Sequence, residues 1–150
     1  MHPANIFFDL EMVFRILMAA FLGSMIGLER ERHGISAGVR TYGAISLGAA
    51  AFGVISLSIM GADPSRVAAQ VATGIGFLCG GVIFREGNHV NGLTTAATLW
   101  ATAAVGLAVA FGMYMISILT SLLMFILLYS SRLRWWKKFT RKTRPIEKGD

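Results

Sequence analysis

NHVNGLTTAATLWATAAVGLAVAFGMYMISILTSLLMFILLYSS, residues 88–131, contains no Asp, Glu, Lys or Arg. A helix that crosses a membrane needs about 20 predominantly apolar residues. The stretch is about twice as long as one such helix. Gly112, Met113 and Tyr114 interrupt it near its middle. It therefore predicts two membrane spans joined by a short turn.

Three earlier stretches have the same character. Residues 42–60 and residues 67–84 contain no charged side chain, and residues 12–28 contain only Arg15. Of the 150 residues, 55% are hydrophobic and 15% are charged, which is too few charges to cover a soluble globular domain. The sequence therefore predicts an all-α, polytopic transmembrane helical bundle with five spans, formed by residues 1–131.

Basic residues are concentrated in two segments of this chain, whose net charge is +6. Arg30, Arg32 and Arg40 follow the first predicted span, and eight Lys and Arg residues follow Ser131. Lys and Arg favour the cytoplasmic side, and five spans place both segments on one side. We therefore predict that the N-terminus is outside and the C-terminus cytoplasmic. Residues 132–150 are then a basic cytoplasmic tail that contacts the lipid bilayer, and no nucleic-acid-binding fold accompanies them.

Small residues recur at four-residue steps on the first four predicted spans. Helices associate in a bilayer through close backbone approach, which small side chains allow. The glycines expected to provide this packing are Gly23, Gly27, Gly76, Gly80 and Gly106. The fifth span is rich in Ile, Leu and Met. We therefore expect spans one to four at the packed centre and span five at the periphery. A remaining face of small residues could form a homodimer interface, and the sequence does not indicate which face.

Arg15 is the charged residue within the first predicted span. An arginine at membrane depth normally faces protein or extends to the interface. Glu11 lies one helical turn before it. Two interpretations stay open: a structural anchor paired with Glu11, and an intramembrane charge with a functional role.

Polar residues gather at the predicted cytoplasmic ends of the spans and form the candidate functional cluster. Its members are Glu29, Arg30, Arg40, Thr41, Arg85, Glu86, Asn88, Thr94, Thr95 and Thr98. The charged members either lock the inner loops together as a buried ion-pair cluster or bind a ligand or partner, such as a hydrated cation or an anionic headgroup. The threonines either line a polar path or bond to helix carbonyls.

The sequence indicates neither an enzyme nor a metal centre. Mg²⁺ takes oxygen ligands in an octahedral shell, and no acidic residue lies at the predicted membrane midplane. His33 and His89 lack metal-ligand spacing with Cys79, the single cysteine. No nucleophile–base pair or carboxylate dyad is recognisable. We therefore expect no catalytic residue, no cofactor and no assigned metal site.

Four short segments carry a family resemblance. The segments GLERER (27–32), GVRT (38–41), GIGFLCGGVIFREG (74–87) and GLTTAATLW (92–100) closely resemble the MgtC/SapB family. The resemblance covers about residues 15–113, and the spacing between the segments also matches. Cys79 stands where a small residue is common in the family, and Asn91 stands where a basic residue is common.

The resemblance implies a multi-pass protein of the bacterial inner membrane that is linked to magnesium homeostasis and, in some members, to virulence. It also implies modulation of a membrane partner, such as a transporter or the ATP synthase. Many members carry a cytoplasmic ACT-like domain, which we do not expect in residues 132–150. We therefore expect a non-enzymatic modulator. The alternative is a transporter or channel for magnesium or another cation, with Glu29, Glu86 and the threonine row as its path.

Overall fold

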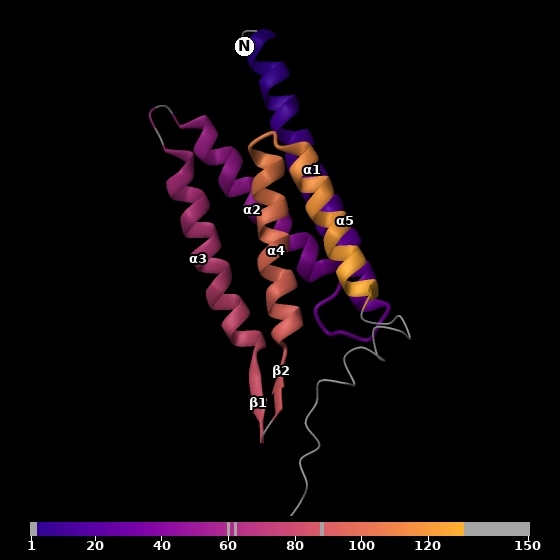
Figure 1. Ribbon diagram of the computed structural model, residues 1–150. Coiled ribbons are helices and arrows are strands. Elements are labelled where there is room, and N and C mark those ends of the chain that lie inside the picture. Colours follow the sequence, from indigo (N-terminus) through magenta and orange to yellow (C-terminus); the bar gives the residue numbers. More distant parts are fainter. Residues whose placement is uncertain (1–2, 60, 62, 88, 131–150) are drawn as a thin grey trace, which may run out of the picture.

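The computed structural model describes the backbone of residues 3–59, 61, 63–87 and 89–130, and the side chains from residue 6 onward within these ranges. This part of the chain folds into five helices and one two-stranded hairpin (Figure 1). The helices are α1 (Pro3–Glu31), α2 (Val39–Ser58), α3 (Pro64–Val82), α4 (Leu93–Ala110) and α5 (Tyr114–Ser130). The strands β1 (Phe84–Glu86) and β2 (His89–Asn91) lie between α3 and α4.

The helices begin and end where the sequence supplies caps and turns. The Asp63 side chain accepts a hydrogen bond from the Ser65 backbone N–H at 2.9 Å, and Pro64 takes the first helical position of α3, where an N–H is not needed. Hydrogen bonds from Ser65 lower the pKa of Asp63, so this cap is anionic at neutral pH. Gly112 has φ +72° in the turn between α4 and α5, which confirms the predicted break.

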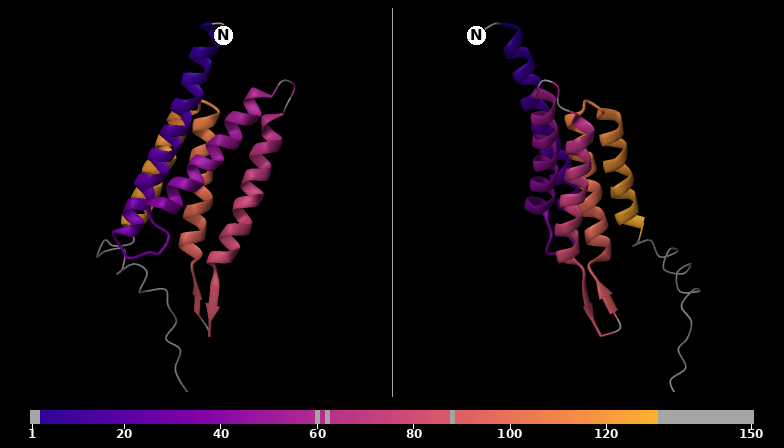
Figure 2. Two further views of the ribbon diagram at one scale, coloured as in Figure 1. Left: turned by 180° about the vertical axis from the view of Figure 1, so that it is seen from behind. Right: turned by 90° about the vertical axis from the view of Figure 1, so that its left-hand side faces the viewer.

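The packed centre consists of α1, α2 and α4, with α2 in close contact with both of the others. Figure 2 shows α5 against α1 and α4 on one side of the bundle. Buried apolar side chains fill the centre, among them Ala19, Ile26, Tyr42, Val105 and Val109. These small and medium-sized side chains allow the three helices to lie close together.

The position of α3 corrects the expectation that the first four spans form the packed centre. Cys79 is its one buried residue, and the Phe77 side chain is 84% exposed. A Cβ atom built on Gly76 or Gly80 would have no heavy atom within 4 Å. Helix α3 therefore lies at the periphery together with α5. Small residues recur at four-residue steps on α3 as expected, but Gly76 and Gly80 do not meet another helix of the chain.

Two elements extend beyond the predicted spans. Helix α1 has 29 residues, which corresponds to about 43 Å, and so it is longer than the hydrocarbon core. The predicted inner loop is an antiparallel hairpin in which Arg85 pairs with Val90 and Glu86 with His89. Figure 1 shows this hairpin projecting past the ends of α3 and α4.

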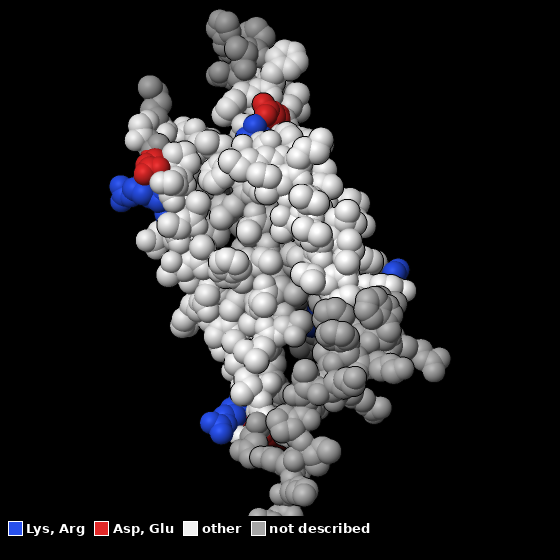
Figure 3. Space-filling view, viewed as in Figure 1, with Lys and Arg blue, Asp and Glu red and all other residues white. Residues whose placement is uncertain are grey.

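The surface of the bundle suits a lipid environment. Helices α2 and α4 are long and apolar enough to cross a membrane, and α5 is a shorter apolar helix. Large apolar side chains such as Phe21, Trp100 and Leu127 are exposed. In the view of Figure 3, the charged side chains lie toward the two ends of the bundle, and the surface between them is uncharged. An apolar surface of this extent is unusual for a soluble monomer.

Candidate functional site

Two glycines of α1 bring its backbone into contact with α2. A Cβ atom at Gly23 would lie 2.6 Å from the carbonyl oxygen of Tyr42 and 2.6 Å from the Cβ of Ser46. A Cβ atom at Gly27 would lie 2.7 Å from the carbonyl oxygen of Gly38. These separations are shorter than van der Waals contact, so a larger residue at either position would push the helices apart.

Gly106 makes the corresponding contact between α4 and α2. A Cβ atom at Gly106 would lie 2.2 Å from the carbonyl oxygen of Ser46. Ser46 is fully buried. Ser46 of α2 therefore lies between Gly23 of α1 and Gly106 of α4. Three of the five glycines expected to pack helices lie at these two contacts.

A set of hydrogen-bonded side chains lies within this tightly packed part of the bundle. We call it the polar network; it consists of Arg30, Tyr42, Thr95, Thr98 and Thr102. The Arg30 side chain is buried, and its Nη2 donates a hydrogen bond to Thr95 Oγ1 at 3.1 Å. A buried guanidinium is costly unless it is hydrogen-bonded. This bond connects the last turn of α1 to the first turn of α4.

The hydroxyl groups of the polar network bond to one another or to their own helix. Tyr42 Oη lies 2.5 Å from Thr98 Oγ1 and joins α2 to α4. Thr98 Oγ1 lies 2.9 Å from the carbonyl oxygens of Thr94 and Thr95, to which it donates. Thr102 Oγ1 donates to the carbonyl oxygen of Thr98 at 2.7 Å. These bonds favour a packing role for the threonines over the lining of a polar path.

Carboxylates of α1 organise the loop that follows the helix. Glu29 is buried, and its Oε1 lies 3.3 Å from the Nδ1 of His33. Glu31 accepts a hydrogen bond from the Val39 backbone N–H at 2.9 Å, so it satisfies a donor in the first turn of α2. Among the described residues, no group of three His, Cys, Asp or Glu side chains is arranged to hold a metal ion.

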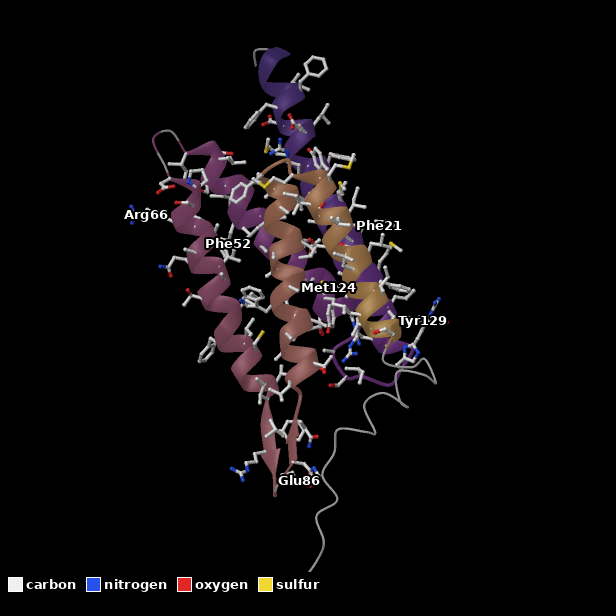
Figure 4. All side chains as sticks on the ribbon, in the orientation of Figure 1. Phe21, Phe52, Arg66, Glu86, Met124 and Tyr129 are labelled. Atoms are coloured by element: carbon white, nitrogen blue, oxygen red, sulfur yellow. The ribbon has the colours of Figure 1, made fainter. Side chains whose placement is uncertain are left out.

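The structure divides the candidate functional cluster predicted from the sequence. Glu29, Arg30 and Thr95 are buried and Thr98 is half-buried; Arg40, Thr41, Thr94, Arg85 and Glu86 are exposed. Figure 4 places Glu86 on the hairpin that projects from the bundle, and Arg85 donates from Nε to the carbonyl oxygen of Gly87 at 2.9 Å. Asn88 lies outside the described residues. The hypothesis that Glu86 and Arg85 join Glu29 and Arg30 in one buried cluster is therefore wrong.

Tyr42 and Ser46 are buried residues of this region that the sequence reasoning missed. Tyr42 could have been identified from its place at the start of an apolar stretch, because a buried tyrosine hydroxyl there needs a hydrogen-bond partner. Ser46 follows one helical turn later on the same face of α2. Its role depends on Gly23 and Gly106 from two other helices, so no local pattern indicates it.

Arg15 lies at the opposite end of the bundle from the polar network. Its Nη1 donates to the carbonyl oxygen of Ala110 at 2.5 Å, at the C-terminal end of α4, and its Nη2 pairs with Glu11. The ring of Phe14 contacts the ring of Tyr114 edge-on, with centroids 6.4 Å apart. Arg15 therefore has the structural partner that was expected, and it also caps α4.

Replacing Tyr42 with phenylalanine is expected to lower the free energy of unfolding by about 1 kcal/mol, the usual size of a hydrogen bond between membrane helices. The side chain volume hardly changes, so the loss reports the bond to Thr98. Thermal unfolding in detergent, followed by circular dichroism, measures the change. The double variant with Thr98→Val should lose less stability than the sum of the two single losses, because each single variant already removes the same bond. Full additivity would show that the two hydroxyls do not interact.

The helical bundle, the large apolar side chains exposed on its surface and the polar network between its helices define a helical membrane protein. The chain belongs to the MgtC family, whose sequence model matches residues 16–134. No solved structure matches the chain.

Similar curated proteins come from several bacteria. The chain is 41% identical over 127 residues to "Putative magnesium transporter YhiD" of Escherichia coli K12, a match that covers 79% of this chain and 59% of the relative. It is 43% identical over 117 residues to "Uncharacterized protein slr0014" of Synechocystis, covering 77% and 50%. It is 44% identical over 102 residues to "Protein MgtC" of Salmonella typhimurium strain 14028s, covering 68% and 44%. The chain thus spans about half the length of these relatives.

Proposed function

We propose that this protein is a non-enzymatic, multi-pass protein of the bacterial inner membrane that contributes to magnesium homeostasis by modulating a membrane partner, such as a transporter or the ATP synthase. Membership of the MgtC family and the name of the Escherichia coli relative, a putative magnesium transporter, support the link to magnesium. Each of the five helices overlaps one predicted span, which supports five spans, with the basic residues 132–150 in the cytoplasm.

The scarcity of buried carboxylates that could bind a cation is the observation that favours modulation over transport. Among the acidic side chains that the structure describes, Glu29 is buried and the others are exposed. The hydroxyls of Thr98 and Thr102 already donate to helix carbonyls. A hard cation such as Mg²⁺ takes about six oxygen ligands. One buried carboxylate and a few neutral hydroxyl oxygens offer such a cation little compensation for its lost water.

The outer face of α3 offers a surface for a partner within the bilayer. Gly76 and Gly80 have open space where a side chain would be, and Phe77 between them is largely exposed. Small residues allow a second helix to approach closely, which is the main source of helix association in lipid. Contact at this face is how the proposed modulation would begin.

A photo-crosslinking amino acid at Gly80 tests the proposal in cells grown at low magnesium. The matched control carries the same amino acid at Leu127 of α5, which is 69% exposed but has no small residue beside it in the chain. We expect crosslinks to a different protein from position 80 and none from position 127. Crosslinks that join only copies of this chain, or that are equal from both positions, would reject a modulating role.

Cation transport is the second candidate, because Glu29, which precedes Arg30 of the polar network in the sequence, is a buried carboxylate. Purified protein in liposomes loaded with a magnesium-sensitive dye separates the two functions. Transport predicts a magnesium flux that Glu29→Gln abolishes and that the exposed Glu86→Gln leaves intact. Modulation predicts no flux above that of protein-free liposomes for the unsubstituted protein or for either variant.

A further inference from the structure

An apolar groove of about 1040 Å³ lies between α2 and α3. The two helices are joined by a turn near residue 61 and separate along their lengths, as the left view of Figure 2 shows. Its walls are mainly small and apolar: Ala44, Gly48 and Phe52 from α2, and Val71, Gly74 and Leu78 from α3. The space beside Gly48 and Gly74 is open, since no heavy atom lies within 4 Å of a Cβ built on either residue.

The polar groups that line the groove are all at one end of it. Asp63, Arg66 and Gln70 belong to the N-terminal cap and first two turns of α3. The Asp63 carboxylate is engaged with the Ser65 backbone N–H. Arg66 is exposed, and among the described residues it forms no ion pair with a carboxylate. Figure 4 shows Arg66 at the end of α3 nearest this turn. The groove thus has a polar end, which carries the Asp63 carboxylate and the Arg66 guanidinium, and an apolar length.

We propose that this groove binds one membrane phospholipid, with its phosphate at Arg66 and its acyl chains along Gly48 and Gly74. The polarity of the lining matches that of an amphiphile, because Asp63, Arg66 and Gln70 lie at one end and apolar walls continue from them. Arg66 can contact the phosphate, and Asp63 can contact the donor groups of a headgroup. The volume is that of a small-molecule site.

The site is independent of the proposed modulating role. Gly76 and Gly80, the residues offered there as a partner surface, do not line the groove. Loss of lipid binding and loss of partner crosslinking are therefore separate results obtained with different variants.

Three glycines of one chain provide a matched test. Gly48→Leu and Gly74→Leu place side chains into the groove, whereas Gly76→Leu places the same side chain outside it. All three positions have no heavy atom within 4 Å of a built Cβ, so the substitutions do not disturb packing within the chain. Leucine also has a higher helix propensity than glycine. Unchanged thermal unfolding in detergent verifies that each variant is folded.

The probe is phosphatidylglycerol with a photoactivatable group on one acyl chain, incorporated with the full chain into nanodiscs, and mass spectrometry locates the labelled residues. We expect labelling at Phe52 and Leu78 that Gly48→Leu and Gly74→Leu largely abolish and that Gly76→Leu retains. Competition by unlabelled phosphatidylglycerol should weaken about fivefold in Arg66→Gln, the effect of one basic residue near a lipid surface.

Two results would overturn the proposal. Labelling of α2 and α3 that is unchanged in Gly48→Leu and Gly74→Leu, or no denser there than on α5, would show ordinary bulk lipid contact. Dissociation of an oligomer in Gly74→Leu but not in Gly76→Leu, measured by analytical ultracentrifugation with lipid labelling unaffected, would show that a second copy of the chain occupies the groove.

Discussion

Replacing Gly106 with alanine should destabilise the bundle by about 3 kcal/mol, the upper part of the usual range for overpacking. The added Cβ would lie 2.2 Å from the carbonyl oxygen of Ser46 and 3.1 Å from the Cβ of Ala49. Because the first of these atoms belongs to the α2 backbone, no side-chain rotation relieves the contact. Helices α2 and α4 would have to separate, and the Tyr42–Thr98 hydrogen bond between them would lengthen.

Thermal unfolding in detergent measures this effect, and Gly76→Ala on α3 is its control. Gly76 is also a helical glycine but has open space around it, so alanine there should change stability by less than about 1 kcal/mol, in the stabilising direction. Equal effects at the two positions would show that α2 and α4 do not make the close contact described at Ser46.

Replacing Arg15 with methionine should lower the free energy of unfolding by about 2 kcal/mol, which is typical of a hydrogen bond to a charged group. Methionine retains much of the apolar stem, so the loss reports the guanidinium and its bond to the Ala110 carbonyl oxygen. That carbonyl belongs to the last turn of α4, which has no intrahelical donor for it. The same thermal unfolding assay, with Arg15→Lys added, shows whether a point charge can replace the guanidinium.

Glu11→Gln separates the two hydrogen bonds of Arg15. Glu11 is about half exposed, so its pair with Arg15 should be worth less than about 1 kcal/mol. A loss in Glu11→Gln as large as that in Arg15→Met would contradict the assignment of Ala110 as the main partner. Such a result would show that the ion pair between Glu11 and Arg15 is the main interaction, as the sequence suggested.

The helical fold was predictable because it depends on local properties of the chain. Each of the five predicted spans overlaps one helix, and the break at Gly112 separates α4 from α5. Hydrophobic length and missing charge are properties of consecutive residues, so they are readable without knowledge of the neighbours. The hairpin of β1 and β2 was not predicted, because its strands have only three residues each.

The candidate site was predictable only in part. Arg30 and Thr95 were selected because they are polar residues at the ends of apolar stretches, and the structure brings them together. Arg85 and Glu86 were selected for the same reason, but the hairpin holds them away from the bundle. The direction in which a segment leaves a helix is a tertiary property, and composition does not contain it.

The small-residue pattern shows most clearly what each level determined. The sequence alone determined that this chain forms apolar helices with glycines on one face, because spacing along a helix sets which residues share a face. Only the tertiary structure decided that Gly23, Gly27 and Gly106 meet a neighbouring backbone and that Gly76 and Gly80 meet none. The physical reason is that close contact requires two surfaces, and the second surface belongs to a helix that lies elsewhere in the sequence.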